Sequence, residues 1–276
     1  MSKAQAVREL LAGLPIRLGA QATVRKLNGG LNNDVFRISG EDGDFVLRLG
    51  HKQAGLPDIS CELSILRDAA KAGLGPDVEY ADPSRGILLL RFVQGRTWER
   101  EDLLLPGNIG ALAGLLRDVH ALPSCGTEFD IAGIAEKNLR TLYRRDELRH
   151  FGSDCLRIVR EEIATDSRVC CHNDVVAGNL VAGDRLKLID WEWAADNEPM
   201  FDLASIVAYH DLGTDLADTL LGTYAGGADA LLRERYWAQA RLFDALQWLW
   251  LAARETRHPD VAQVARLGTL QSRIGA

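Results

Sequence analysis

Residues 171–190 constrain the fold of this chain more than any other segment. They contain His172, Asp174 and Asn179 in the spacing H-x-D-x-x-x-x-N, followed by two short apolar runs around a Gly-Asp turn. Apolar runs separated by such a turn predict a β-hairpin, and the second run ends on Asp190. Because a hairpin brings its two ends together, Asp190 is expected beside Asn179, with Asp174 in the loop that precedes them.

Three oxygen-bearing side chains in one short segment are suited to phosphoryl transfer. This reaction needs one carboxylate near the attacking hydroxyl and separate oxygen ligands for Mg²⁺ on the phosphates of a nucleotide. We predict that Asp174 binds the hydroxyl substrate and is the catalytic residue that accepts its proton, and that Asn179 and Asp190 hold the metal. The alternative is a polar surface hairpin, since Asp and Asn are common in turns. The apolar strands favour a buried hairpin, where carboxylates are costly unless they are used.

This region belongs to a longer pattern, formed by His172-Asn173-Asp174, Ile189-Asp190-Trp191-Glu192-Trp193 and Phe201-Asp202-Leu203. The pattern resembles the choline/ethanolamine kinase family, which is grouped with aminoglycoside phosphotransferases and thiamine kinase. The resemblance implies an α+β, two-lobed, protein-kinase-like fold, with a small antiparallel-sheet N-terminal lobe and a larger, mainly helical C-terminal lobe. It implies that residues 1–92 bind the nucleotide, that residues 93–276 hold the catalytic and acceptor-binding groups, and that ATP and Mg²⁺ are the cofactors. It also implies that His172 and Asp202 brace the catalytic loop.

The N-terminal part of the chain is predicted to form five antiparallel strands, at 23–27, 35–38, 45–49, 78–80 and 86–90. Gly29 and Gly30 lie between the first two strands, where glycine would let backbone N–H groups approach phosphates, although two glycines also make ordinary hairpin turns. The family carries a G-G-L-[TS]-N turn here, which implies that both glycines and Asn32 contact ATP; Asn32 replaces the usual Thr or Ser. The resemblance also implies a hinge at Phe92 and Val93 whose backbone groups bind adenine.

Two charged residues of this lobe are predicted to form a pair. Arg48 takes the place of the lysine in the V-A-I-K strand of protein kinases, and its planar, permanently charged fork suits a phosphate clamp. Glu62 lies on a predicted helix over 59–72 and is expected to pair with Arg48, as the corresponding kinase residues do. The alternatives are a solvent-facing arginine on the sheet and an exposed acid on the helix.

The acceptor-binding residues are predicted from a C-terminal helix over 234–254 that is rich in aromatic residues. Aromatic residues at helical spacing usually belong to a core, but choline kinases enclose a quaternary ammonium in an aromatic cage near this helix. The resemblance implies that Trp193, Tyr209, Gln247 and Trp250 bind the acceptor. Gln247 replaces the first Trp of the family's W-x-x-W helix, and Tyr209 stands where choline kinases usually have Glu, so the cage is altered.

Composition narrows the function further. A net charge of −7 without a block of Lys or Arg argues against nucleic acid as a partner, and no apolar run approaches the ~18 residues of a membrane span. Five cysteines without C-x-x-C spacing favour a reducing cytoplasm, with all five as small buried hydrophobic residues and no zinc site. Together with what the resemblance implies, the sequence predicts a cytoplasmic, ATP-dependent phosphotransferase acting on a small cationic alcohol such as choline or ethanolamine. Thiamine, aminoglycoside or sugar kinases and a non-catalytic pseudokinase are the alternatives, and the number of subunits is not predicted.

Overall fold

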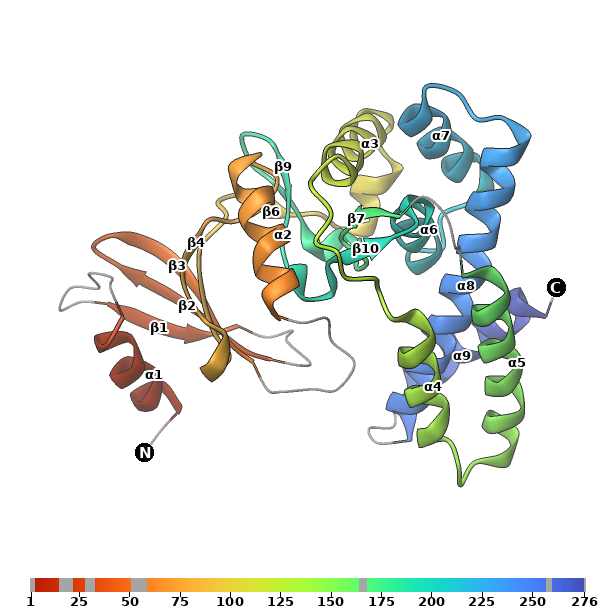
Figure 1. The fold of residues 1–276 in the computed structure, drawn as a ribbon, viewed down its shortest axis with the longest axis horizontal. Coiled ribbons are helices and arrows are strands. Elements are labelled where there is room, and N and C mark those ends of the chain that lie inside the picture. Colours follow the sequence, from red (N-terminus) through yellow and green to blue (C-terminus); the bar gives the residue numbers. More distant parts are fainter. Residues whose placement is uncertain are drawn as a thin grey trace.

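The computed structural model describes residues 3–14, 22–27, 33–50, 59–163, 168–256 and 260–275. Figure 1 shows two lobes, a small one built on a twisted sheet and a larger one made mostly of helices. The two-lobed α+β fold predicted from the sequence is therefore present. The predicted lobe boundary at residues 92 and 93 falls directly after the last strand of the sheet.

The small lobe contains a five-stranded antiparallel sheet in the order β1-β2-β3-β5-β4. Its strands are β1 (Thr23–Lys26), β2 (Asn33–Gly40), β3 (Gly43–Gly50), β4 (Val78–Asp82) and β5 (Ile87–Arg91), with α1 (Lys3–Ala12), α2 (Ile59–Lys71) and the short 3₁₀ helix η1 (Pro83–Arg85). Phe45 and Leu47 on β3 are fully buried in one hydrophobic cluster with Leu11, which follows from the alternation of side chains along a strand. This alternation turns Arg48 to the opposite face of the sheet.

The large lobe combines helices with short strands. Its strands are β6 (Arg96–Thr97), β7 (Val169–Cys171), β8 (Leu180–Ala182), β9 (Leu186–Leu188) and β10 (Ala195–Asn197). Its α-helices are α3 (Pro106–His120), α4 (Ile131–Thr141), α5 (Asp146–Glu162), α6 (Pro199–Tyr209), α7 (Thr214–Ala225), α8 (Ala230–Glu255) and α9 (Val261–Ile274). Its 3₁₀ helices are η2 (Arg100–Leu104), η3 (Ala177–Asn179) and η4 (Trp191–Trp193).

Helix α2 connects the two lobes through its buried face. Leu66 of α2 belongs to the same hydrophobic cluster as Trp191, which lies in the large lobe. The backbone N–H of Leu188 donates to the carbonyl of Leu74, just after α2, at 2.8 Å. The helix that carries Glu62 is therefore anchored to the residues on both sides of Asp190.

A disulfide also joins the lobes, and it corrects the prediction that all five cysteines are free thiols. Cys61 on α2 is bonded to Cys125 in the loop after α3, with their Cα atoms 5.6 Å apart. The sequence carries no signal for this pair, because its partners come from different lobes and only the fold brings them together. Cys155, Cys170 and Cys171 are buried and free, as predicted. The argument for a reducing cytoplasm from cysteine usage therefore loses its support.

Removing the disulfide is expected to destabilise the protein. The double variant Cys61→Ala/Cys125→Ala should lower the free energy of unfolding by about 4 kcal/mol, the value that chain entropy gives for a sequence separation of 64. Urea unfolding measures this change. Reductant should shift the wild-type midpoint to that of the variant and leave the variant unchanged. Equal wild-type midpoints with and without reductant would refute the pairing.

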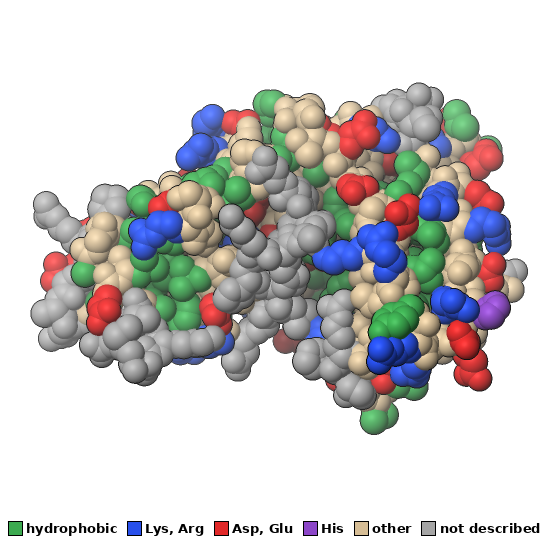
Figure 2. All heavy atoms as spheres, turned by 60° about the horizontal axis from the view of Figure 1, so that its bottom comes forward, with side chains coloured by type: hydrophobic (Ala, Val, Ile, Leu, Met, Phe, Trp, Pro, Cys, Tyr) green, Lys and Arg blue, Asp and Glu red, His purple; other side chains and the backbone are tan. Residues whose placement is uncertain are grey.

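The surface shows no division by charge on the face that Figure 2 presents, where Lys and Arg side chains are interspersed with Asp and Glu side chains. Within the described ranges, no helix combines the length and the apolar character that crossing a bilayer requires.

Candidate active site

The predicted hairpin brings Asp174, Asn179 and Asp190 together. Leu180 of β8 pairs with Leu188 of β9, and the N–H of Ile189 donates to the carbonyl of Asn179 at 2.9 Å, which closes the mouth of the hairpin. The Nδ2 atom of Asn179 donates to the Oδ2 atom of Asp174 at 3.0 Å and to the Asp174 carbonyl at 2.9 Å. All three side chains line one cavity of about 370 Å³. The predicted convergence of these side chains is confirmed.

Two residues of this segment adopt left-handed backbone conformations, Asn173 with φ 63° and Asp190 with φ 65°. Asp and Asn tolerate this region better than most residues. Asn173 is held there by its side chain, whose Nδ2 donates to the carbonyls of Trp193 at 3.0 Å and Ala195 at 3.2 Å. Its Oδ1 accepts from Asn197 at 2.8 Å. The sequence analysis assigned no role to Asn173, although it stands between the two residues of the H-x-D motif.

Asp202 and His172 hold the catalytic loop, as the resemblance implies. The fully buried carboxylate of Asp202 accepts from the backbone N–H groups of His172 and Asn173, each at 2.8 Å. The ring of His172 contacts the carbonyl of Ile189 through Nε2 at 3.0 Å, so it ties the loop to the residue before Asp190. His120 lies 3.1 Å from Asp202 and completes this buried network.

Two carboxyl groups of the site, those of Asp174 and Asp190, have raised pKa values. Burial and the charge of Asp190 raise the pKa of Asp174 to about 7. Limited access of water and the charge of Glu192 raise the pKa of Asp190 to about 6, although this carboxylate remains half-exposed to the cavity. Arg48 approaches Asp190 no closer than 3.9 Å. Such a surplus of negative charge favours the binding of a cation in the cavity.

The donor set fits a magnesium ion. The Nδ2 atom of Asn179 is directed to Asp174, so its amide oxygen is left as a ligand, and Asp190 adds a carboxylate at the cavity surface. Hard oxygen donors of this kind, few in number and completed by phosphate oxygens and water, are what Mg²⁺ prefers.

The lining of the cavity is also rich in aromatic side chains. The four predicted acceptor-binding residues, Trp193, Tyr209, Gln247 and Trp250, all line it. The sequence analysis missed three more rings in the lining, those of Phe129, Phe201 and Phe243. Phe129 packs edge-on against Trp193 with ring centroids 6.1 Å apart, and against Phe201 at 5.9 Å. No Lys or Arg occurs among the described residues of the lining.

Comparison with known proteins decides the family. The family described as APH, the phosphotransferase enzyme family, matches residues 23–243. The chain belongs to this family. Its relatives include LicA of Haemophilus influenzae, 49% identical over 218 residues that make up 71% of this chain and 61% of LicA. The chain thus spans less than two thirds of the length of that relative.

Other similar proteins match this chain over a larger share of their own length. Thiamine kinase of Escherichia coli is 29% identical over 232 residues, which are 79% of this chain and 76% of that enzyme. A crystal structure of a choline/ethanolamine kinase family protein from Mesorhizobium loti has a TM-score of 0.77 at 25% identity, covering 98% of this chain and 93% of that one. The resemblance seen in the motifs is therefore confirmed.

The predicted ion pair of Arg48 and Glu62 is present. An Nη atom of Arg48 lies 2.5 Å from the Glu62 carboxylate, and the two side chains are 11% and 6% exposed. The pair sits at the junction of β3 and α2, so it couples the sheet to the helix anchored on the large lobe. It leaves the guanidinium beside Asp190, at the edge of the predicted phosphate site.

Breaking this buried pair is expected to be costly. Arg48→Met should lower the free energy of unfolding by about 3–5 kcal/mol, because it leaves the Glu62 carboxylate buried without its partner. The double variant Arg48→Met/Glu62→Met should recover most of that loss while turnover stays impaired. Urea unfolding and ADP release measure the two effects. A double variant no more stable than Arg48→Met would contradict this account.

The other residues predicted to bind the nucleotide lie only partly within the described part of the chain. Gly29, Gly30 and Asn32 lie outside the described residues. Asn33, which follows them, hydrogen-bonds the Glu192 carboxylate, and both side chains line the cavity. The sequence analysis assigned no role to Asn33 or Glu192, although both belong to segments with family motifs.

The hinge prediction needs one correction. The N–H of Phe92 donates to the carbonyl of Asp44 at 2.9 Å, so it is not directed at adenine. The sheet satisfies this group because it continues the pairing of β3 with β5. Of the two backbone groups of Phe92, the prediction therefore keeps only the carbonyl, and the predicted N–H donor of the hinge is that of Val93.

His210, directly after α6, contacts the loop that carries Asp174 and was not singled out by the sequence analysis. Its Nε2 accepts from the N–H of Ala177 in the catalytic loop at 2.9 Å. Burial and the nearby Arg100 lower the pKa of His210, which keeps the ring neutral and able to accept. Nothing in the local sequence signals this contact, since it depends on the bend after α6.

Proposed function

We propose that this chain is an ATP- and Mg²⁺-dependent phosphotransferase that phosphorylates the hydroxyl group of a small cationic alcohol of the choline or ethanolamine type. The observation that carries the proposal is the convergence of Asp174, Asn179 and Asp190 in a cavity whose lining also contains six aromatic side chains. The first part of this arrangement suits phosphoryl transfer, and the second suits an organic acceptor.

Asp174 is the catalytic residue in this proposal. Its carboxylate orients the hydroxyl of the alcohol and takes its proton as the bond from the alcohol oxygen to the γ-phosphorus forms and the bond from the γ-phosphorus to ADP breaks, which releases ADP. A pKa of about 7 suits this task, because the group is then both available as a base and strong enough to act near neutral pH. The hydrogen bond from Asn179 fixes the orientation of the carboxylate.

Other residues position the nucleotide. Mg²⁺ and ATP, when bound, supply the transferable phosphoryl group and neutralise charge on its oxygens. Asn179 and Asp190 hold the metal, and Arg48 is directed at the phosphates. Gly29, Gly30 and Asn32 contribute to the phosphate contacts, and the backbone at Phe92 and Val93 meets adenine.

The acceptor is a cation in this proposal because of the cavity's chemistry. Aromatic faces attract ammonium groups, and Asp174, Asp190 and Glu192 add negative charge to the same lining. The relative named thiamine kinase supports a small-molecule acceptor. Thiamine is the second candidate, because the described cavity departs from a purely aromatic cage at Gln247.

A panel of alcohols tests the proposal. Choline, ethanolamine, thiamine and an aminoglycoside are each supplied with ATP and Mg²⁺, and ADP release is followed in a coupled assay. A cationic alcohol should accelerate ADP release at least about tenfold over the rate without alcohol, and chelation of Mg²⁺ should remove the effect. Equal rates with and without every alcohol would favour a nucleotide-binding protein without transfer activity.

A further inference from the structure

Gln247 places a polar group in an otherwise aromatic part of the cavity. It extends from α8 and lines the cavity together with Tyr209 and Trp250. An amide in such a wall has a definite polarity, because one end accepts hydrogen bonds and the other donates them. The chemistry that Gln247 offers to a ligand therefore depends on which end faces the cavity.

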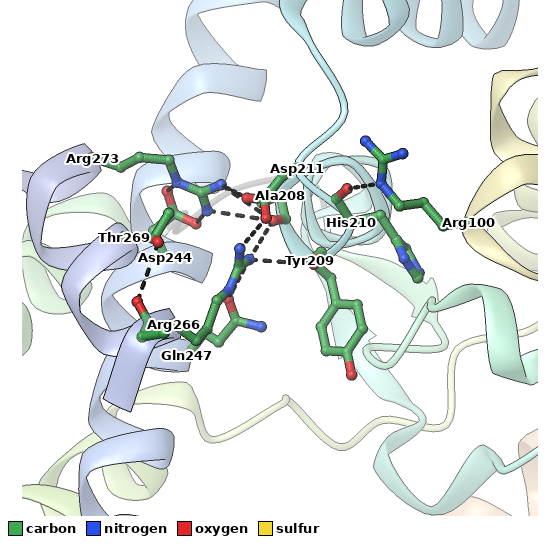
Figure 3. A network of polar contacts seen from close by, with 11 residues as sticks. Arg100, Ala208, Tyr209, His210, Asp211, Asp244, Gln247, Arg266, Thr269 and Arg273 are labelled. Atoms are coloured by element: carbon green, nitrogen blue, oxygen red, sulfur yellow. Dashed lines mark hydrogen bonds and ion pairs between the residues drawn. The ribbon is translucent and has the colours of Figure 1, made fainter. Parts of the chain in front are cut away.

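The orientation of this amide follows from an arginine clamp, which we define as Arg266 and Arg273 of α9 with their partners Asp211 and Asp244. Arg273 donates to Asp244 through Nε at 2.9 Å and to Asp211 through Nη1 at 2.5 Å. Arg266 forms an ion pair with Asp211 and donates to the carbonyl of Ala208 at 2.8 Å. Figure 3 shows these contacts converging on the end of α6.

Within the clamp, Arg266 also donates through Nη2 to the Oε1 atom of Gln247 at 3.2 Å. A guanidinium group has donors and no acceptor, so only the oxygen of the amide can face it. The Nε2 atom of Gln247 must then point the other way, and Figure 3 shows it on the side of the Tyr209 ring. No described residue accepts a hydrogen bond from this nitrogen.

An amide N–H group directed into a cavity calls for an acceptor on the ligand. A quaternary ammonium cannot accept this hydrogen bond, because it has no lone pair. Its positive charge also faces the positive end of the N–H dipole. We propose that the substrate alcohol carries, besides its reacting hydroxyl and its cationic group, a separate hydrogen-bond acceptor that binds Nε2 of Gln247. A carbonyl, an ether oxygen or a heteroaromatic ring nitrogen would serve. Gln247 determines specificity, and Arg266 is a positioning residue acting through it. This inference rests on the proposed function and, among its cationic alcohols, selects the second candidate, a thiamine-like alcohol, over choline and ethanolamine.

Choline and thiamine are the probes that test this inference. Both are cations with a hydroxyethyl group, but thiamine also carries pyrimidine ring nitrogens that accept hydrogen bonds, whereas choline carries no such group. The ratio of kcat/KM for thiamine to that for choline is measured in the wild type and in Gln247→Met. The wild type should favour thiamine, and Gln247→Met should lower the ratio about tenfold, mainly through KM for thiamine.

Variants of Arg266 distinguish its effect on the orientation of the Gln247 amide from a purely structural role. Arg266→Met frees the amide to turn over and should lower the same ratio, while Arg266→Lys, which still donates to Oε1, should retain more of it. Gln247→Glu provides a second test with the shape of the side chain kept, because it replaces the donor by an acceptor and should shift preference towards choline. The affinity for ADP, measured by calorimetry, should stay the same in all of these variants.

Two outcomes overturn the inference in different ways. A thiamine-to-choline ratio that is unchanged in both Gln247→Met and Gln247→Glu would refute it and leave the proposed function standing. Phosphorylation of neither alcohol nor of any other member of the panel by the wild type would refute the proposed function, and this inference with it.

Discussion

Asp174→Asn is expected to lower kcat for phosphorylation of the alcohol by about 10³- to 10⁴-fold, the upper range for loss of a general base. Asparagine keeps the shape of the side chain but cannot take the hydroxyl proton. Nucleotide binding should change little, since Asn179 and Asp190 remain. ADP release in the presence of alcohol measures kcat, and calorimetry measures the affinity for ADP with Mg²⁺.

The matched control is Asp184→Asn, which removes an acid from the turn of the same hairpin. Asp184 is exposed and is not part of the cavity lining, so this variant should retain wild-type turnover. Comparable turnover by Asp174→Asn and the wild type would show that proton acceptance lies elsewhere.

Asp174→Asn should also stabilise the folded protein at high pH, relative to the wild type. Burial, together with Asp190, raises the pKa of Asp174 from 3.8 to about 7, so ionised Asp174 opposes folding above pH 7. Below the ordinary pKa the carboxyl is protonated in both states and the effect disappears. The melting temperature of Asp174→Asn relative to the wild type should therefore rise as the pH increases from 3.8 to about 7. Thermal unfolding at a series of pH values measures this difference.

The second large effect is expected at the metal site. Asp190→Ala should abolish Mg²⁺-dependent turnover, because it removes the one carboxylate among the two predicted metal ligands. A titration of ADP release against Mg²⁺ measures this loss. Near-normal activity at ordinary Mg²⁺ concentrations would refute the assignment of Asp190.

The backbone at Asp190 requires a paired variant. With φ 65°, this position disfavours alanine by about 1 kcal/mol, whereas asparagine tolerates the left-handed region. Asp190→Asn should thus lose most Mg²⁺-dependent turnover while unfolding at the same urea concentration as the wild type. A loss of activity in Asp190→Ala that Asp190→Asn fails to share would point to backbone strain rather than to a lost metal ligand.

The sequence predicts those parts of the site that are close together in the chain. Asp174, Asn179 and Asp190 are joined by one hairpin, so local turn chemistry and apolar patterning are enough to place them side by side. The pair of Arg48 and Glu62 could also be predicted, because the family resemblance implies the fold that brings β3 and α2 together. Local chemistry and a known topology thus account for the catalytic half.

The acceptor half depends on contacts that no local pattern contains. Phe129 reaches the cavity because its N–H donates to Asp196 at 2.9 Å, which docks its loop against β10. Arg266 reaches Gln247 because α9 packs back against α8. The disulfide of Cys61 is a similar case. In each case the partners are distant in sequence and chemically unremarkable until the fold is known.

The central claim is that Asp174, Asn179 and Asp190 transfer a phosphoryl group to an alcohol held in the aromatic cavity. Phosphorus NMR of a reaction with ATP, Mg²⁺ and the preferred alcohol of the panel tests it most directly. The wild type should produce a phosphate monoester and ADP in equal amounts, and Asp174→Asn should produce neither in detectable amount within the time that the wild type needs to complete the reaction. Ester formed by Asp174→Asn at the wild-type rate, or ADP with free phosphate and no ester from the wild type, would contradict the account.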